Sequence, residues 1–100
     1  MSDETSPAPK PEGPIESDEN IKFVSGLRCH ICGTFPVEVH HWKSRGSGGG
    51  DGLENLVSLC PRHHREFHDK GVLTFWKKYG TALKFFRNWK GLPQLATPEE

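Results

Sequence analysis

Two short pairs of metal-binding residues constrain this chain more than any other feature of its sequence. Each pair has a two-residue spacer, and 27 residues separate the pairs, which are Cys29 with Cys32 and Cys60 with His63. A Cys-x-x-Cys or Cys-x-x-His turn directs both side chains at one centre, and two such turns complete a tetrahedral zinc site. Incidental thiols beside a surface histidine would leave this spacing unexplained, and an odd number of cysteines argues against a closed set of disulfides. The sequence therefore predicts a structural zinc.

Other histidines predict a second metal site. On a helix, His64 and His68 lie about 40° apart on one face, whereas His63 is rotated by about 100° from His64. One ion does not easily take His63 together with the other two, so the helix is expected to serve two centres. A third ligand is expected from the preceding strand, where His40 and His41 are adjacent. Neighbours on a strand point to opposite faces, so spacing alone leaves open which of them binds metal, and a histidine satisfied within the strand is the alternative.

The N-terminal half of the chain predicts a tail followed by two short strands around a loop. Residues 1–20 are acidic and rich in proline, with Ile15 as their single large apolar side chain, and are expected to form a disordered tail. Alternation and β-branched residues predict strands over 37–42 and 56–59. Between them, residues 46–50 contain four glycines and are expected to form a loop.

The C-terminal half predicts helices. Pro61 is well placed as the first residue of a helix, and Gly71 is expected to end it. Beyond it, aromatic and aliphatic residues recur at helical intervals with basic residues mostly on the other side, and Gly80 leaves open one kinked helix or two short ones. We expect one folded domain over residues 21–91 and a flexible C-terminus over residues 92–100.

Charge is unevenly distributed along the chain, although its formal net charge is zero. Residues 21–98 hold 12 Lys and Arg against 5 Asp and Glu, which gives +7, and the remaining acids lie near the two ends. A basic body favours a polyanionic partner, although small domains often carry several charges. No apolar run approaches the roughly 20 residues that span a bilayer, and the N-terminus lacks a signal-peptide pattern, so we expect a cytoplasmic protein without membrane association.

Four motifs occur in an order that resembles a known family. They read "CHIC", "VEVHHW", "GGGDGLENLVSLC" and "PRHHREFH", and together they span residues 29–68, less than half of the chain. This order resembles the HNH endonucleases, also called ββα-metal nucleases, in the branch whose motif is flanked by two zinc knuckles. The resemblance implies an α+β protein with a small ββα-metal fold, stapled by a structural zinc and extended by a C-terminal amphipathic helix.

The resemblance also implies roles for individual residues. His41 is expected to be the general base that activates water, an imidazole being a competent base near neutral pH. Asn55 is expected to orient the His41 side of the motif. The ligands of the catalytic divalent metal are expected to be His40, His64 and His68. The implied function is metal-dependent hydrolysis of DNA phosphodiester bonds, by nicking or double-strand cleavage. RNA and single-stranded nucleic acid are alternative substrates, and the active form is expected to be a monomer or a weak homodimer.

Some residues depart from the usual family pattern or have two interpretations. His63 stands where cysteine is commoner, a replacement that zinc accepts. His40 stands where aspartate is frequent, which makes the catalytic site all-imidazole, so Mn²⁺, Ni²⁺, Co²⁺ or Zn²⁺ is expected to compete with Mg²⁺ there. Glu38 shares the strand face of His40 and either bonds a ligand histidine or is simply exposed. Four basic residues are expected to contact phosphates or to form an ordinary solvated face: Lys43, Arg45, Arg62 and Arg65. The alternative function is a zinc-stabilised nucleic-acid-binding module without catalysis.

Overall fold

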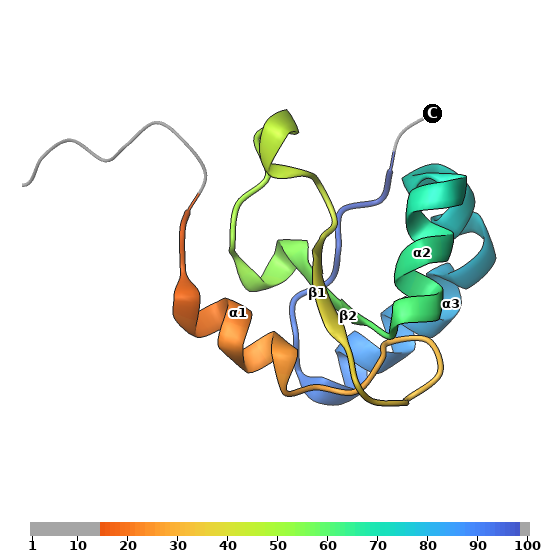
Figure 1. The fold of residues 1–100 in the computed structure, drawn as a ribbon, viewed down its shortest axis with the longest axis horizontal. Helices are drawn as coiled ribbons and strands as arrows, with labels where there is room; N and C mark the ends of the chain where they lie inside the picture. Colours follow the sequence, from red (N-terminus) through yellow and green to blue (C-terminus); the bar gives the residue numbers. More distant parts are fainter. Residues whose placement is uncertain (1–14, 99–100) are drawn as a thin grey trace, which may run out of the picture.

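Two short strands and three helices form a small α+β structure. The computed structural model describes residues 15–98, and Figure 1 shows the arrangement of its elements. In chain order these are α1 (Asp18–Ser25), β1 (Glu38–His41), the 3-10 turns η1 (Arg45–Ser47) and η2 (Leu53–Asn55), β2 (Leu56–Leu59), α2 (Pro61–Lys70) and α3 (Val72–Lys90). The expected α+β class is confirmed, and both strands occur where the sequence predicts them. Within these residues no helix is long and apolar enough to cross a membrane.

The strands β1 and β2 form an antiparallel hairpin at the centre of the molecule. In their register His40 lies opposite Val57 and His41 lies opposite Leu56. All four residues of β2 are buried, since α1 and α2 both contact this strand and lie on opposite sides of the hairpin in Figure 1. Because side chains alternate along a strand, His40 and His41 face different helices.

Helices α2 and α3 meet at a glycine. Pro61 begins α2, and Gly71, with φ 88°, ends it as expected. The stretch after Gly71 is one helix that runs through Gly80, so of the two alternatives left open by the sequence the single helix holds. At Gly80 a Cβ atom would lie 3.4 Å from the Trp76 ring, which shows how closely that ring packs on the helix backbone.

The core joins the hairpin to α2 and α3. The Trp42 ring lies with its centroid 5.5 Å from that of Phe67, and Phe67 lies 5.1 Å from Phe75 in the same way. The buried cluster also contains Cys29 and Cys60, two of the expected zinc ligands. The turns that carry the expected zinc ligands are therefore continuous with the hydrophobic core.

Helix α1 corrects the expected boundary of the N-terminal tail. The sequence placed residues 1–20 in that tail, but the helix starts at Asp18, and the Ser17 side chain caps it by accepting from the backbone N–H of Asn20. Val24 is the one fully buried residue of this helix, which has acidic residues in its first turn. Residues 1–14 of the expected tail lie outside the described residues.

The segment after α3 also departs from the expectation of a flexible C-terminus. Leu92 and Leu95 are only 8% and 6% exposed, and the indole N–H of Trp42 donates to the carbonyl of Ala96 at 2.9 Å. These contacts hold the segment against the core, and only residues 99–100 of this stretch lie outside the description. The apolar residues that do this are too few to stand out in the sequence.

A buried arginine fastens this segment to the hairpin. Arg87 is fully buried, although the sequence suggested that the basic residues of this helix lie mostly outside its apolar face. Its guanidinium donates to the carbonyls of Leu53, Leu56 and Pro93. Burial, together with the charge of Arg87, lowers the pKa of the neighbouring His30 to about 3, so this histidine is neutral and serves as a core residue.

Candidate active site

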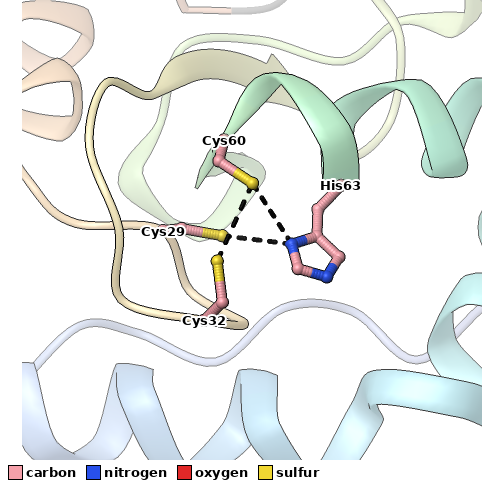
Figure 2. A group of neighbouring side chains, drawn as sticks. All are labelled: Cys29, Cys32, Cys60 and His63. Carbon is pink, nitrogen blue, oxygen red and sulfur yellow. Dashed lines mark hydrogen bonds between the residues drawn. The ribbon is translucent and has the colours of Figure 1, made fainter.

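Four side chains from two turns converge at the N-terminal end of α2. Figure 2 shows that the sulfurs of Cys29, Cys32 and Cys60 and the Nδ1 atom of His63 point toward one another. Cys32 Sγ lies 3.7 Å from Cys60 Sγ, and His63 Nδ1 lies 3.3 Å from Cys60 Sγ and 3.7 Å from Cys29 Sγ. Ligand atoms on a tetrahedral zinc, bound at 2.0 to 2.3 Å, lie roughly 3.3 to 3.8 Å apart. The group therefore fits a zinc ion.

The surroundings of these thiols favour ionisation of two of them. Burial opposes ionisation of Cys32, but hydrogen bonds from Thr34 outweigh it and lower the pKa of the thiol to about 7. Burial likewise opposes ionisation of Cys60, but hydrogen bonds from His63 outweigh it, so the pKa of Cys60 is lowered as well. For Cys29, burial dominates and raises the pKa. Since zinc binds thiolates, the two lowered values favour metal binding.

A second group of metal-binding atoms lies on the other side of α2. His40 Nδ1 is 3.0 Å from His64 Nε2, and His68 Nε2 is 3.2 Å from the same atom. These separations are close to the roughly 3.3 Å expected between imidazole nitrogens bound at about 2.05 Å to a tetrahedral ion. The strand thus contributes His40 rather than His41 to this group.

A carboxylate orients the central histidine of this group. His64 donates from Nδ1 to the carboxylate of Glu38 at 2.5 Å, which leaves its Nε2 lone pair directed toward His40 and His68. A carboxylate behind a histidine ligand is a common arrangement at metal sites, because it fixes both the tautomer and the ring orientation. Of the two interpretations of Glu38 given above, the hydrogen bond is the one observed.

The environment of His40 keeps that ring neutral. Burial, followed by the nearby charges of His64, His68 and His41, lowers the pKa of His40 to about 4. Its Nε2 atom is buried and has no hydrogen-bond partner within residues 15–98, and its ring packs on Phe67 with centroids 4.0 Å apart. At neutral pH, His40 therefore offers a lone pair to a metal ion without first having to lose a proton.

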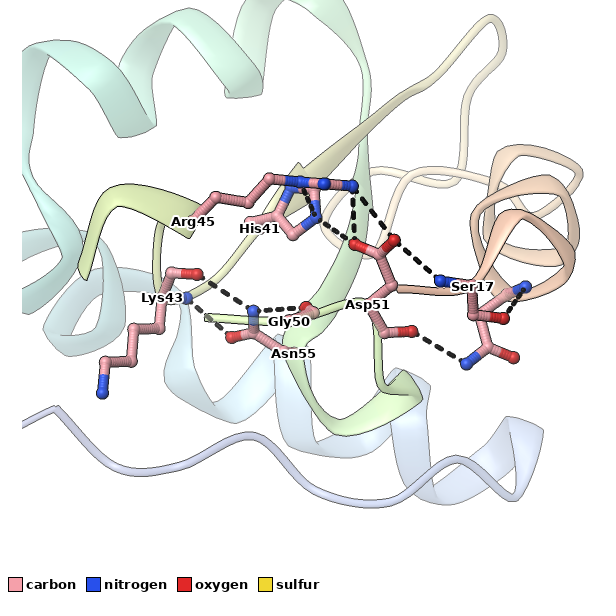
Figure 3. A network of polar contacts seen from close by, with 8 residues as sticks. Ser17, His41, Lys43, Arg45, Gly50, Asp51 and Asn55 are labelled. Carbon is pink, nitrogen blue, oxygen red and sulfur yellow. Dashed lines mark hydrogen bonds and ion pairs between the residues drawn. The ribbon is translucent and has the colours of Figure 1, made fainter. Parts of the chain in front are cut away.

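His41 points to the opposite side of β1 and joins a different network, shown in Figure 3. Its Nε2 atom lies 2.7 Å from Oδ1 of Asp51, a residue that is only 2% exposed. Arg45 donates to both oxygens of the same carboxylate, and the backbone N–H of Ser17 donates to Oδ2. The His41 hydrogen bond, the Ser17 N–H and the Arg45 charge lower the pKa of Asp51, so this carboxylate is ionised beside His41.

Asn55 fixes the loop between the strands. Its side-chain oxygen accepts from the Lys43 N–H at 2.7 Å, and its amide donates to the carbonyls of Lys43 and Gly50, each at 2.9 Å (Figure 3). Gly49 passes so close to this amide that a Cβ atom would lie 1.8 Å from the Lys43 carbonyl oxygen. The glycine at this position is required by close backbone approach, and Asn55 fixes the chain just after His41.

Comparison with known proteins identifies the segment that carries these groups. A family model described as HNH endonuclease matches residues 29–70. Residues 29–70 belong to the HNH endonuclease family. The resemblance noted from the motifs is thereby confirmed, and the HNH segment extends from the first cysteine turn to the end of α2.

One relative of the HNH segment is a bacterial restriction enzyme. The type IV methyl-directed restriction enzyme EcoKMcrA of Escherichia coli (strain K12) is 53% identical over 32 residues, which are 32% of this chain and 12% of that enzyme. The chain therefore spans only a small part of this relative. No solved structure matches the chain significantly. The family model and this relative both support a nuclease family for the HNH segment.

The HNH segment contains every residue that the sequence singled out for the site, and the structure sorts them into three places. One side of α2 carries His63, which joins the three cysteines, and the other side carries His64 and His68 beside His40. The side chain of His41 lies on the opposite face of β1 from that of His40. The sequence missed Asp51 as the partner of His41. The signal was a single acid within "GGGDG", where an aspartate in a flexible loop ordinarily means only a turn.

A cleft lies next to the two adjacent histidines of β1, His40 and His41. It has a volume of about 500 Å³, and its walls include His40, His41, Lys43, His68 and Thr97. Its far side is formed by the C-terminal segment, which the sequence did not place near the site. The side chains of Lys43, Arg62 and Arg65 are exposed, whereas Arg45 is partly engaged by Asp51. A ligand in this cleft would lie against both His40 and His41.

Proposed function

We propose that this chain is a metal-dependent HNH endonuclease that hydrolyses DNA phosphodiester bonds, with His41 as the general base. The observation that carries the proposal is that two adjacent histidines of β1 have different surroundings. His40 joins a group of three metal-binding nitrogens, while the adjacent His41 is left out of it and lies beside an ionised carboxylate. One cleft is lined by both residues. A purely structural zinc domain has no use for this second, separate arrangement.

In the proposed reaction His41 accepts a proton from water as the water oxygen bonds to phosphorus. The bond from phosphorus to the 3′ oxygen then breaks, and that oxygen takes a proton from solvent. A divalent ion held by His40, His64 and His68 would stabilise negative charge on the phosphate and the departing oxygen. Asn55 keeps the backbone after His41 in place, and Cys29, Cys32, Cys60 and His63 would hold a structural Zn²⁺ within a small ββα-metal fold.

The ligand set bears on which ion works at the catalytic site. Three imidazoles are softer than the oxygen ligands that Mg²⁺ prefers, so Mn²⁺, Ni²⁺, Co²⁺ and Zn²⁺ are candidates beside Mg²⁺. The neutral state of His40, whose pKa is lowered to about 4, makes this ligand available throughout the neutral range. We expect activity with the softer ions to exceed activity with Mg²⁺.

DNA is the proposed partner, with RNA and single-stranded nucleic acid as alternatives. Residues 21–98 carry a net charge of +7, and exposed Lys43, Arg62 and Arg65 flank the HNH motif. Such residues contact phosphates without reading sequence, so binding is expected to weaken as salt increases. The restriction enzyme that shares part of the HNH segment supports DNA as substrate. We propose a cytoplasmic protein that acts as a monomer or weak homodimer, without membrane association.

The proposal predicts the products of a simple assay. Purified zinc-loaded protein should convert supercoiled plasmid to relaxed plasmid only when a divalent ion is added, because one site of this type cuts one strand at a time. The new ends should carry 5′-phosphate and 3′-hydroxyl groups. End labelling after incubation with Mg²⁺, Mn²⁺, Ni²⁺, Co²⁺ or Zn²⁺ measures both.

Two results would oppose the proposal. Ends that carry 3′-phosphate would exclude the stated direction of bond cleavage. DNA binding without cleavage by any ion in the panel would favour the alternative, a zinc-stabilised nucleic-acid-binding module that lacks catalysis.

A further inference from the structure

We propose that Asp51 is a positioning residue that determines which nitrogen of His41 accepts the proton, an inference that rests on the proposed nuclease function. Asp51 directly follows the glycine-rich loop of residues 46–50, ten positions after His41, and its carboxylate is almost completely buried. It does not contact the three-histidine group. Its role is therefore separate from metal binding.

The hydrogen bonds around Asp51 leave its carboxylate a single orientation. Oδ2 accepts from the backbone N–H of Ser17 at 2.9 Å and from Nη2 of Arg45 at 3.0 Å. Oδ1 accepts from the same Arg45 nitrogen at 2.8 Å and faces His41 Nε2 at 2.7 Å. Because Oδ2 is occupied by groups from two other segments, Oδ1 is the oxygen available to His41.

This orientation decides the tautomer of His41. An ionised carboxylate only accepts hydrogen bonds, so the Nε2 atom of His41 must carry the proton. Arg45 Nε also lies 3.3 Å from Nε2, but two donors cannot share a hydrogen bond, and the shorter contact to Asp51 is the one with an acceptor. The lone pair then lies on Nδ1, which makes no hydrogen bond within residues 15–98 and is free to take a proton from water.

Helix α1 makes this arrangement depend on a segment before the HNH motif. Besides the Ser17 N–H, the side-chain amide of Asn20 donates to the Asp51 carbonyl at 2.8 Å, and the Asp51 N–H donates to the Ile15 carbonyl at 2.7 Å. Ile15, Ser17 and Asn20 therefore hold Asp51 by both its backbone and its side chain. Residues that the sequence assigned to a tail hold the partner of the proposed base.

Replacing Asp51 by asparagine should reverse the tautomer with little change in shape. The two donors at the Oδ2 position require an oxygen there, so the asparagine NH₂ group would occupy the position that faces His41. A donor at that position needs an acceptor on Nε2, which moves the His41 proton to Nδ1 and removes the lone pair that would accept a proton from water. We expect kcat for DNA cleavage to fall by about 10²-fold or more, with KM nearly unchanged.

The decisive test is nitrogen NMR of zinc-loaded, ¹⁵N-histidine-labelled protein with Mg²⁺ and without DNA, which reports the protonated nitrogen of His41. The wild type should show a protonated Nε2 and the Asp51→Asn variant a protonated Nδ1. Asn20→Ala, which loses a contact to the Asp51 backbone but keeps the carboxylate, is the structural control and should keep the wild-type tautomer. Asp18→Asn removes the same charge from an exposed site and should keep the wild-type rate.

Each outcome bears on one claim. A wild-type His41 protonated on Nδ1, or a folded Asp51→Asn variant with unchanged kcat, would overturn the inference. If Asp51→Asn does not fold, the wild-type tautomer alone decides the inference. A wild type that has the expected tautomer but cleaves no DNA with any metal would instead overturn the proposed nuclease function, and with it the catalytic consequence of the tautomer.

Discussion

Replacing His41 by alanine is expected to lower the rate of DNA cleavage about 10²- to 10⁴-fold, the usual contribution of a general base. The side chain is 20% exposed and belongs to no group of metal-binding atoms among the described residues, so its loss should leave both metals bound. Asp51 would lose the hydrogen bond that it accepts from His41, but Arg45 and the Ser17 N–H still donate to that carboxylate. Single-turnover cleavage, metal content and the melting temperature of the variant measure these effects.

The comparison with metal content makes this prediction specific. Loss of activity together with loss of the catalytic metal would assign His41 to the ligands rather than to proton transfer. Nearly unchanged activity would show that another group activates the water. Thr81→Ala on the exposed side of α3 is a suitable control, since this residue lies outside the HNH segment and both metal-binding groups.

Adjacent histidines on α2 are expected to respond differently to the same substitution. His63→Ala removes a buried ligand from the cysteine group, so zinc content and the free energy of unfolding should both fall, since metal binding contributes to folding in a domain of this size. His64→Ala removes the nitrogen that lies between His40 and His68, so cleavage should fall at least roughly 10- to 100-fold, the loss typical even for residues behind a ligand. The zinc content and melting temperature of this variant should remain close to the wild type.

Each of these two variants is the control for the other. They differ by one position and by about 100° around the helix, so a general effect of losing a histidine from α2 would appear in both. If His64→Ala also loses tightly bound zinc and has a melting temperature as low as that of His63→Ala, then α2 carries one metal site, and the nuclease proposal loses its geometric support.

The sequence predicted local features of the fold well because they depend on local chemistry. The strands followed from alternation of residue types, and α2 followed from Pro61 and Gly71 at its two ends. The grouping of metal-binding atoms followed from two spacings and the geometry of a helix. What spacing could not decide was whether His40 or His41 joins the group, because this depends on which face of β1 packs against α2.

The features that were missed depend on contacts between distant segments. Asp51 is important only because α1 and Arg45 hold it beside His41, and nothing in "GGGDG" indicates that arrangement. Helix α1 is short and acidic and is anchored mainly by Val24, so its composition suggested a tail. Arg87 has its partners on the hairpin and in the segment after α3. The amphipathic pattern of α3 alone therefore suggested that this residue is exposed.

The central claim is that one short helix separates a structural zinc from a catalytic ion. Anomalous diffraction from crystals of the zinc-loaded protein grown with Mn²⁺ tests it most directly, because data collected at different wavelengths distinguish the two elements. The account predicts a zinc peak among Cys29, Cys32, Cys60 and His63, and a separate manganese peak among His40, His64 and His68. A single metal peak for the whole chain, or manganese bound away from His40, would contradict it.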